Sequence, residues 1–248
     1  MPRSDDFTNR PKTASGANEA APIGVLMLDT QFARLPGDVG NRRSWKTPVL
    51  FRTVRGADPA NVVYGGAQGL LQPFIDAALE LIHDGAAAIT TSCGFLAIFQ
   101  NELAEALPVP VFSSSLMQAP LIQMALPKGK RVGVLTFSAA HLTHTHLRGA
   151  GADISTPIQG VRPGGHFSAY YGNIKCEADF PSLERDVLEA ARTLVEMHPD
   201  IGAILCECTN LPPHSNAIRR ATGLPVYDIM GFVEWIARGL CPPVYRDA

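Results

Sequence analysis

The feature that most limits how this chain can fold is that the chain repeats itself. Three short segments of its first half return, in the same order, in its second half. They are residues 23–26, 87–93 and 110–112 (IGVL, AAITTSC, PVF), and their counterparts are residues 132–135, 202–208 and 225–227 (VGVL, GAILCEC, PVY). The last segment begins 17 residues after a cysteine in both halves (110 − 93 and 225 − 208). We infer an internal duplication, with one equivalent cysteine in each half.

Within each half, short apolar runs alternate with stretches that place apolar residues at helical spacing. The predicted strands are residues 22–28, 49–54, a run ending near 91, 109–112, 131–136, 201–206 and 225–227. The predicted helices are residues 68–83, a segment through about 106, 181–197, 213–221 and 229–238. Such alternation is typical of βαβ units and mainly parallel sheets. We therefore expect an α/β protein of two similar lobes with a cleft between them.

The repeat also gives the expected domain boundaries. Residues 1–20 are polar and have no apolar centre, so they predict a disordered tail and not a secretory signal. The first lobe is predicted at residues 21–127 and the second at 128–227. Residues 228–248 are expected to form a closing helix that packs back on the first lobe.

Composition limits the kinds of partner this chain is expected to bind and indicates the cellular compartment in which we expect it. The 248 residues carry a formal net charge of −2 and no basic block, which argues against nucleic acid and anionic membrane surfaces as partners. The longest apolar runs are shorter than the roughly 18 residues that cross a bilayer. Five cysteines are an odd number and too few for a disulfide framework, so we expect a cytoplasmic protein.

Cys93 and Cys208 each follow a predicted strand and precede a predicted helix. Ligands of open parallel sheets bind at the carboxyl ends of the strands, and a helix start lowers a thiol pKa and attracts anions. Two lobes facing each other would place one sulfur on either side of a substrate. That arrangement suits removal of a proton beside a carboxylate from one face and its return to the other.

A carbanion formed in this way needs fixed hydrogen-bond donors. Hydroxyl and backbone groups near the two cysteines are candidates. They are Thr91, Ser92, Ser113, Ser114, Ser115, Thr209 and Asn210.

TTSCGF at residues 90–95, CTN at residues 208–210 and the strand-initial IGVL resemble the aspartate/glutamate/hydantoin racemase superfamily, from about residue 22 to 240. The resemblance implies two flavodoxin-like lobes with parallel sheets related by pseudo-two-fold symmetry. It also implies catalysis by Cys93 and Cys208 without pyridoxal phosphate, so we expect no cofactor and no metal. The expected activity is a cofactor-independent racemase or epimerase acting on a small carboxylate or amino-acid-like substrate, in a homodimer.

The resemblance adds substrate contacts after the first strand of each lobe, at Asp29-Thr30 and at Thr136 and Ser138. The full set of expected substrate-binding residues is Asp29, Ser92, Gly94, Phe95, Ser113, Thr136, Thr209 and Asn210.

Two positions depart from the amino-acid racemases. Gly94-Phe95 stands where they usually have Asn-Thr, and Asn210 stands where they usually have Glu or His. An arylmalonate-decarboxylase-like enzyme, a maleate cis–trans isomerase-like enzyme and a non-catalytic binding protein are therefore alternatives. Decarboxylases of the superfamily keep a single cysteine, so the two cysteines here favour racemisation.

Other polar residues allow more than one interpretation. Cys206 is expected in the core, although Cys206-Glu207-Cys208 is also a weak metal motif; Cys176 and Cys241 are expected to be structural. His141, His144 and His146 are candidates for a metal site or for polar lining of the cleft, and His214 for orienting substrate or capping a helix. The loop arginines Arg42, Arg43 and Arg55 are either solvated or available to a carboxylate.

Overall fold

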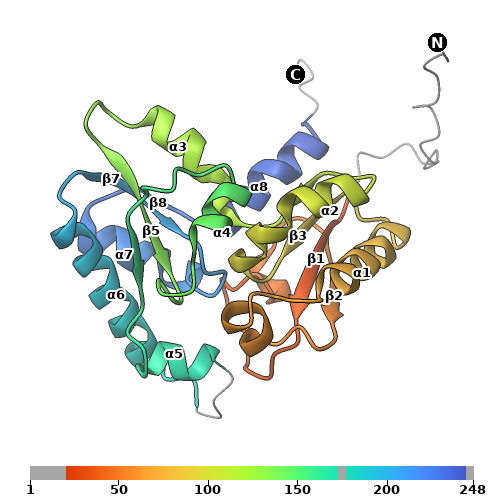
Figure 1. Ribbon diagram of the computed structural model, residues 1–248, viewed down its shortest axis with the longest axis horizontal. Coiled ribbons are helices and arrows are strands. Elements are labelled where there is room, and N and C mark those ends of the chain that lie inside the picture. The colour runs from red at the N-terminus through yellow and green to blue at the C-terminus, as the bar shows by residue number, and fades with distance from the viewer. Residues whose placement is uncertain (1–20, 173–176, 244–248) are drawn as a thin grey trace, which may run out of the picture.

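The computed structural model describes residues 21–172 and 177–243. The expected tail at residues 1–20, Cys176 and residues 244–248 lie outside the described residues. The described chain forms two parallel four-stranded sheets with helices around them (Figure 1), which confirms the α/β fold with two lobes.

The two sheets have the same strand order. The first is β2-β1-β3-β4 and the second is β6-β5-β7-β8. Their strands are β1 (Ile23–Leu28), β2 (Val49–Val54), β3 (Ala88–Thr91) and β4 (Val111–Phe112), then β5 (Arg131–Thr136), β6 (Ile158–Gly160), β7 (Ile201–Cys206) and β8 (Val226–Tyr227). This shared order agrees with the internal duplication, while the pseudo-two-fold relation of the lobes stays a prediction.

Helices connect the strands and cover the sheets (Figure 1). They are α1 (Leu71–His83), α2 (Gln100–Ala106), α3 (Ala119–Ala125), α4 (His144–Gly149), α5 (His166–Tyr171), α6 (Phe180–Met197), α7 (Ser215–Thr222) and α8 (Ile229–Leu240). Short 3-10 helices lie at η1 (Arg42–Ser44), η3 (Gly94–Phe99), η4 (Ser115–Gln118) and η5 (Pro212–His214), and a short π-helix lies at η2 (Ala60–Tyr64). The strand β6 and the helices α3 and α5 were not among the predicted elements, because segments this short show no clear periodic pattern. The still shorter β4 and β8 were recognised only through the repeated Pro-Val-aromatic segment.

The repeated Ile/Val-Gly-Val-Leu segment has the same packing reason in both lobes. A Cβ atom at Gly24 would lie 3.2 Å from the Leu81 Cβ of α1, and one at Gly133 would lie 3.1 Å from the Leu194 Cδ2 of α6. In each lobe, the glycine allows a long helix to approach the central strand closely.

The last helix packs on the first sheet, although the second lobe precedes it in the chain. In α8, Ile229, Phe232, Val233 and Ile236 follow helical spacing and are buried. They form a separate apolar cluster with side chains of β1, β2 and β3. The other face of this sheet belongs to a larger core that continues into the second lobe.

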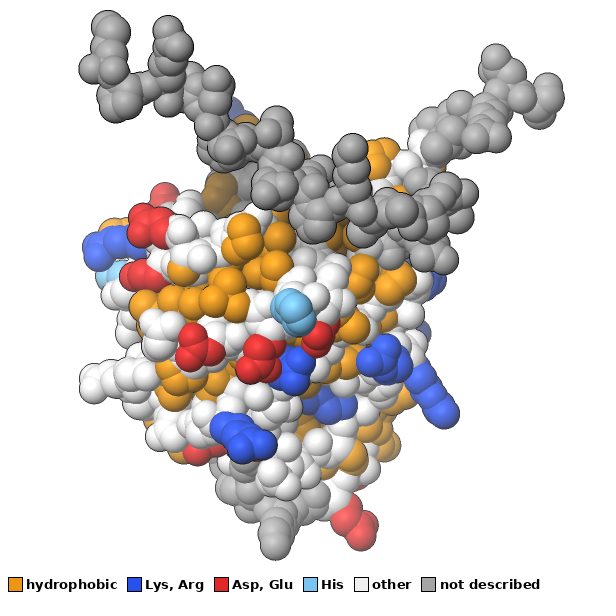
Figure 2. Space-filling model, turned by 90° about the vertical axis from the view of Figure 1, so that its right-hand side faces the viewer, with side chains coloured by type: hydrophobic (Ala, Val, Ile, Leu, Met, Phe, Trp, Pro, Cys, Tyr) orange, Lys and Arg blue, Asp and Glu red, His pale blue; other side chains and the backbone are white. Residues whose placement is uncertain are grey.

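The surface carries charges of both signs. On the face shown in Figure 2, basic, acidic and hydrophobic side chains are interspersed, and the described residues there form no large block of one charge. None of the helices within the described ranges is long and apolar enough to span a membrane.

Candidate active site

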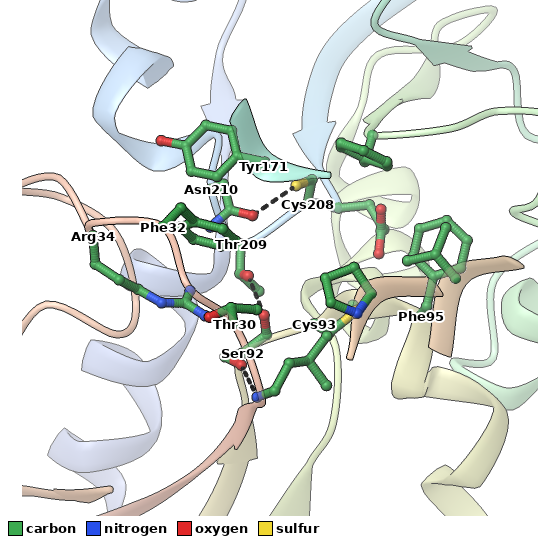
Figure 3. A pocket seen from close by; sticks show the side chains of 16 residues that line it. Thr30, Phe32, Arg34, Ser92, Cys93, Phe95, Tyr171, Cys208, Thr209 and Asn210 are labelled. Atoms are coloured by element: carbon green, nitrogen blue, oxygen red, sulfur yellow. Dashed lines mark hydrogen bonds between the residues drawn. The ribbon is translucent and has the colours of Figure 1, made fainter. Parts of the chain in front are cut away.

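A pocket lies between the lobes, where β1, β3 and β7 end, and encloses about 420 Å³ of empty space that includes open solvent (Figure 3). Both lobes contribute to its lining. Of the residues expected from the sequence, those that line it are Thr30, Ser92, Cys93, Gly94, Phe95, Cys208, Thr209 and Asn210. The sheet topology thus brings together the segments after the two equivalent strands.

The two cysteines occupy matching positions in the fold. Cys93 comes two residues after the end of β3, and Cys208 two residues after the end of β7. Both are buried, and both are free thiols. Thr91 fixes the turn at Cys93, because its hydroxyl donates to the Ser113 carbonyl at 2.6 Å and accepts from the Cys93 N–H at 3.3 Å. Two thiols from opposite lobes therefore line one cavity.

Their surroundings keep both thiols protonated in the unliganded protein. Burial, and then the negative charge of Glu207, raise the pKa of Cys93 to about 12. The same two causes, in the same order, raise the pKa of Cys208 well above its ordinary value. A thiolate at neutral pH therefore requires a change in the electrostatics of the pocket when a ligand binds.

Two of the expected substrate contacts also join the lobes. The Thr209 hydroxyl donates to the Ser92 carbonyl at 2.6 Å (Figure 3). The Asn210 Nδ2 donates to Asp38 Oδ2, also at 2.6 Å. Both bonds are buried, so they hold the cleft in its observed form.

Asp38 connects a loop arginine to Cys208. Arg34 Nη1 lies 3.0 Å from Asp38 Oδ1, so the buried carboxylate has a charged partner. Because the carboxylate accepts, the amide nitrogen of Asn210 faces it and the amide oxygen faces Cys208, whose Sγ lies 3.7 Å away. The Cys208 thiol is thus held as a hydrogen-bond donor.

Four expected substrate contacts lie outside the pocket lining, and one of them is Ser138. Asp29 is half-buried and accepts a 3.4 Å bond from a backbone N–H in the loop after β2. Ser113 is fully buried and donates to Gln100 Oε1 at 2.7 Å. Thr136 donates to Glu207 Oε2 at 2.5 Å, so it reaches the pocket only through Glu207. Each of these side chains is engaged with protein groups.

The histidines after β5 do not act together. His141 pairs with the Ser138 hydroxyl at 2.8 Å, and His144 is exposed. His146 is buried, packs its ring against Phe95 at 5.1 Å between centroids, and has a pKa lowered by burial to about 4. It therefore supports the pocket wall from behind. The residues that the structure describes contain no group of three or more potential metal ligands.

His214 and Cys206 belong to the interior of the second lobe. His214 is buried 3.7 Å from Glu184 Oε2, stacks on Phe180, and makes no side-chain cap of α7. Neither expected role of His214 is present in this geometry. Cys206 is fully buried in the core.

The arginine that lines the pocket is Arg34, and not Arg42, Arg43 or Arg55. It comes from the segment between β1 and β2, which also carries Arg42 and Arg43, but the sequence gave no reason to prefer it. Other lining residues were also missed: Phe32, Phe137, Tyr171 and Glu207. Only Glu207 had a local signal, its place between two cysteines.

Comparisons with known proteins assign the family. Residues 64–233 match the model of the Asp/Glu/Hydantoin racemase family. The chain belongs to this family. Among solved structures, a mutant of arylmalonate decarboxylase in its sulfate-associated form has a TM-score of 0.59 at 18% identity, over 91% of this chain and 95% of that one. Glutamate racemase isoform RacE1 from Bacillus anthracis has a TM-score of 0.56 at 17% identity, over 89% and 83%. At these identities, the likeness concerns the fold.

Curated relatives are more similar in sequence. A dimethylsulfoniopropionate lyase from Durusdinium sp. clade D is 31% identical over 88% of this chain and 75% of its own length. Dimethylsulfoniopropionate lyases 7 and 3 of Emiliania huxleyi (strain CCMP1516) are 31% and 32% identical over 83% of this chain. This chain spans 63% and 56% of those two proteins, less than two thirds of their length.

These relatives are lyases, so the expected racemase or epimerase, and with it the isomerase class, is wrong. The alternative of a related enzyme on the same scaffold agrees better, since a decarboxylase is also a lyase. The cause of the error is chemical. A pair of thiols indicates proton transfer beside a carboxylate, but it does not indicate what the resulting carbanion does next.

Proposed function

We propose that the protein is a lyase that removes the proton beside a carboxylate and expels a leaving group from the next carbon. Dimethylsulfoniopropionate, which the relatives' names specify, is the first candidate substrate. The observation that carries the proposal is the similarity to these lyases over most of the chain, together with two thiols on one buried pocket.

The reaction needs one base. Dimethylsulfoniopropionate is a three-carbon acid with a dimethylsulfonium group on carbon 3. A thiolate at Cys93 or Cys208 takes a proton from carbon 2, and the electron pair of that bond becomes the double bond between carbons 2 and 3. The bond from carbon 3 to sulfur breaks with its electrons on sulfur. The products are acrylate, neutral dimethyl sulfide and a thiol whose proton returns to solvent.

The pocket suits a small carboxylate. Arg34 brings a positive charge to the lining, and its guanidinium is held over the Phe32 ring at 4.8 Å. Lining residues such as Cys93, Phe95 and Glu207 are buried, and the low polarity around them strengthens each electrostatic interaction with the developing carbanion. Racemases and decarboxylases on this scaffold also pass through charge at the carbon beside a carboxylate, so a lyase uses the same kind of site.

The test is direct incubation of the purified protein with dimethylsulfoniopropionate. Dimethyl sulfide is measured by headspace gas chromatography and acrylate by proton NMR. We expect equal amounts of both products, and a loss of about 100-fold or more in kcat for Cys93→Ser, for Cys208→Ser or for both. Cys241→Ser, at the end of α8, is the matched control and should retain the wild-type rate. Absence of both products, or wild-type rates in both active-site variants, would contradict the proposal.

We also propose a cytoplasmic location. Among the described residues, the buried Cys93, Cys206 and Cys208 are free thiols, as expected in a reducing compartment. Fractionation of the source cells with an antibody to the protein tests this.

A further inference from the structure

Glu207 is a buried carboxylate, and one of its two oxygens has no hydrogen-bond partner among the described residues. It follows the last residue of β7 and has no exposed surface. Its Oε2 accepts the 2.5 Å hydrogen bond from Thr136. Its Oε1 has no hydrogen-bond partner among the described residues, and the side chain lines the pocket between the lobes. A charged oxygen without a partner in such a place is expensive unless a ligand satisfies it.

Gly94 makes room for this carboxylate. A Cβ atom at Gly94 would overlap Glu207 Oε1 and would lie 2.6 Å from the Glu207 carbonyl oxygen. No residue with a side chain fits there while Glu207 keeps its position. The difference at position 94 from the amino-acid racemases therefore has a structural cause. A glycine is needed there because the buried Glu207 side chain occupies the space of a Cβ atom.

The charge of Glu207 has no cationic partner at Oε1, although Arg34 lines the same pocket. Arg34 is occupied by Asp38 and by the Thr30 hydroxyl, at 3.0 and 3.1 Å. The walls beside these charges are aromatic. The rings that line the pocket are Phe32, Phe95, Phe137 and Tyr171. Aromatic faces attract onium groups, and a carboxylate attracts them more strongly.

We propose that Glu207 binds the cationic head of a zwitterionic substrate, a carboxylic acid with a methylated onium group. The substrate class rests on the proposed lyase function. The proposal also gives the bound cation a second effect. By neutralising Glu207, it removes the charge that opposes ionisation of both cysteine thiols. The substrate would thus help to form the thiolate that removes its proton.

A matched pair of unreactive ligands tests the binding part without turnover. 4-(Trimethylammonio)butanoate and 5,5-dimethylhexanoate have nearly the same shape and carry no leaving group on carbon 3, but only the first carries a positive charge. Isothermal titration at pH 8 gives the dissociation constant of each ligand for the wild type, Glu207→Gln and the control Glu105→Gln on exposed α2. We expect the wild type and the control to bind the cationic ligand at least about tenfold more tightly than the neutral one. Glu207→Gln should bind the two ligands within about twofold of each other, with its circular dichroism unchanged.

A second measurement tests the effect on the thiols. The rates at which iodoacetamide alkylates Cys93 and Cys208, followed by mass spectrometry at pH 8, should rise in unliganded Glu207→Gln. Glu207→Asp keeps the charge and should keep the preference for the cationic ligand. A wild type without that preference, or a Glu207→Gln variant that retains it, would overturn the proposal. Failure of the lyase function gives a different result, because a protein that releases no dimethyl sulfide can still show the Glu207-dependent preference.

Discussion

Replacing Glu207 by glutamine should make the folded protein more stable at neutral and alkaline pH. Burial raises the pKa of Glu207 from 4.5 to about 7. The folded protein therefore keeps a proton that the unfolded chain has already released between these two pH values. Stability then falls as pH rises through this window, and the loss is complete above about pH 7. The protonated acid at low pH and the glutamine amide have nearly the same shape and no charge.

The size of the effect follows from the same two values. The pKa of Glu207 differs by 2.5 (7 − 4.5) between the folded and unfolded states. At about 1.36 kcal/mol for each pKa unit, the free energy of unfolding falls by about 3 kcal/mol. Because Glu207 has no exposed surface, solvent screening does not reduce this figure much. We expect Glu207→Gln and the wild type to be similar at pH 4.5, and the variant to be about 3 kcal/mol more stable at pH 8.

Urea unfolding followed by circular dichroism, at intervals from pH 4.5 to 8.5, measures this difference. His146 and His214 have pKa values lowered by burial, so the stability they add is present above their unfolded pKa near 6.5 and is lost as pH falls. That contribution is common to both proteins and cancels when one curve is subtracted from the other. The exposed Glu105→Gln should give a flat difference. A flat difference for Glu207→Gln would refute the reasoning, since it would show that Glu207 is not a destabilised buried carboxylate.

Three further substitutions probe the packing and hydrogen bonds around the site. Gly94→Ala should destabilise the protein by roughly 1–3 kcal/mol in urea unfolding, because the new methyl group overlaps Glu207; adding Glu207→Ala should recover only part of this loss, since the backbone carbonyl remains. Asp38→Asn removes the carboxylate that orients the Asn210 amide, so the pH profile of Cys208 alkylation should change. Tyr170→Phe deletes a 2.7 Å bond from its hydroxyl to a backbone carbonyl in the loop after β1, and should lower stability by about 1 kcal/mol. An unchanged alkylation profile, or unchanged unfolding midpoints in the other two, would contradict these accounts.

The strands and the cysteine positions were predictable for a physical reason. Fully buried parallel strands read as continuous apolar runs, and β5 and β7 have the predicted bounds. Once two such strands are recognised as equivalents, sheet topology alone places the residues after them at the same edge. Cys93 and Cys208 meet in one pocket for this reason, and Ser92 and Thr209 come with them.

The rest of the site depends on packing that has no periodic signal. Arg34 comes from a long loop whose course is set by contacts across the cleft, such as the Asp38–Asn210 bond. Tyr171 comes from α5, a helix of 6 residues that amphipathic spacing cannot reveal. Glu207 would ordinarily point to solvent, and only the glycine at position 94 allows it to be buried. The type of reaction was equally hidden, since it depends on the leaving group that a substrate carries.

The route of the chain limits how the two lobes can move. The chain leaves the first lobe after β4 and returns to it between β8 and α8, and the Gln118 side chain donates to the Asp228 carbonyl at 3.0 Å, which ties the two crossings together. Two bodies joined along one edge swing open most easily about that edge, as a book does about its spine. The Thr209–Ser92 and Asn210–Asp38 hydrogen bonds join the two lobes at the pocket, so an opening motion has to break them. Because these hydrogen bonds also shape the site, access to the pocket and the geometry of its lining are coupled.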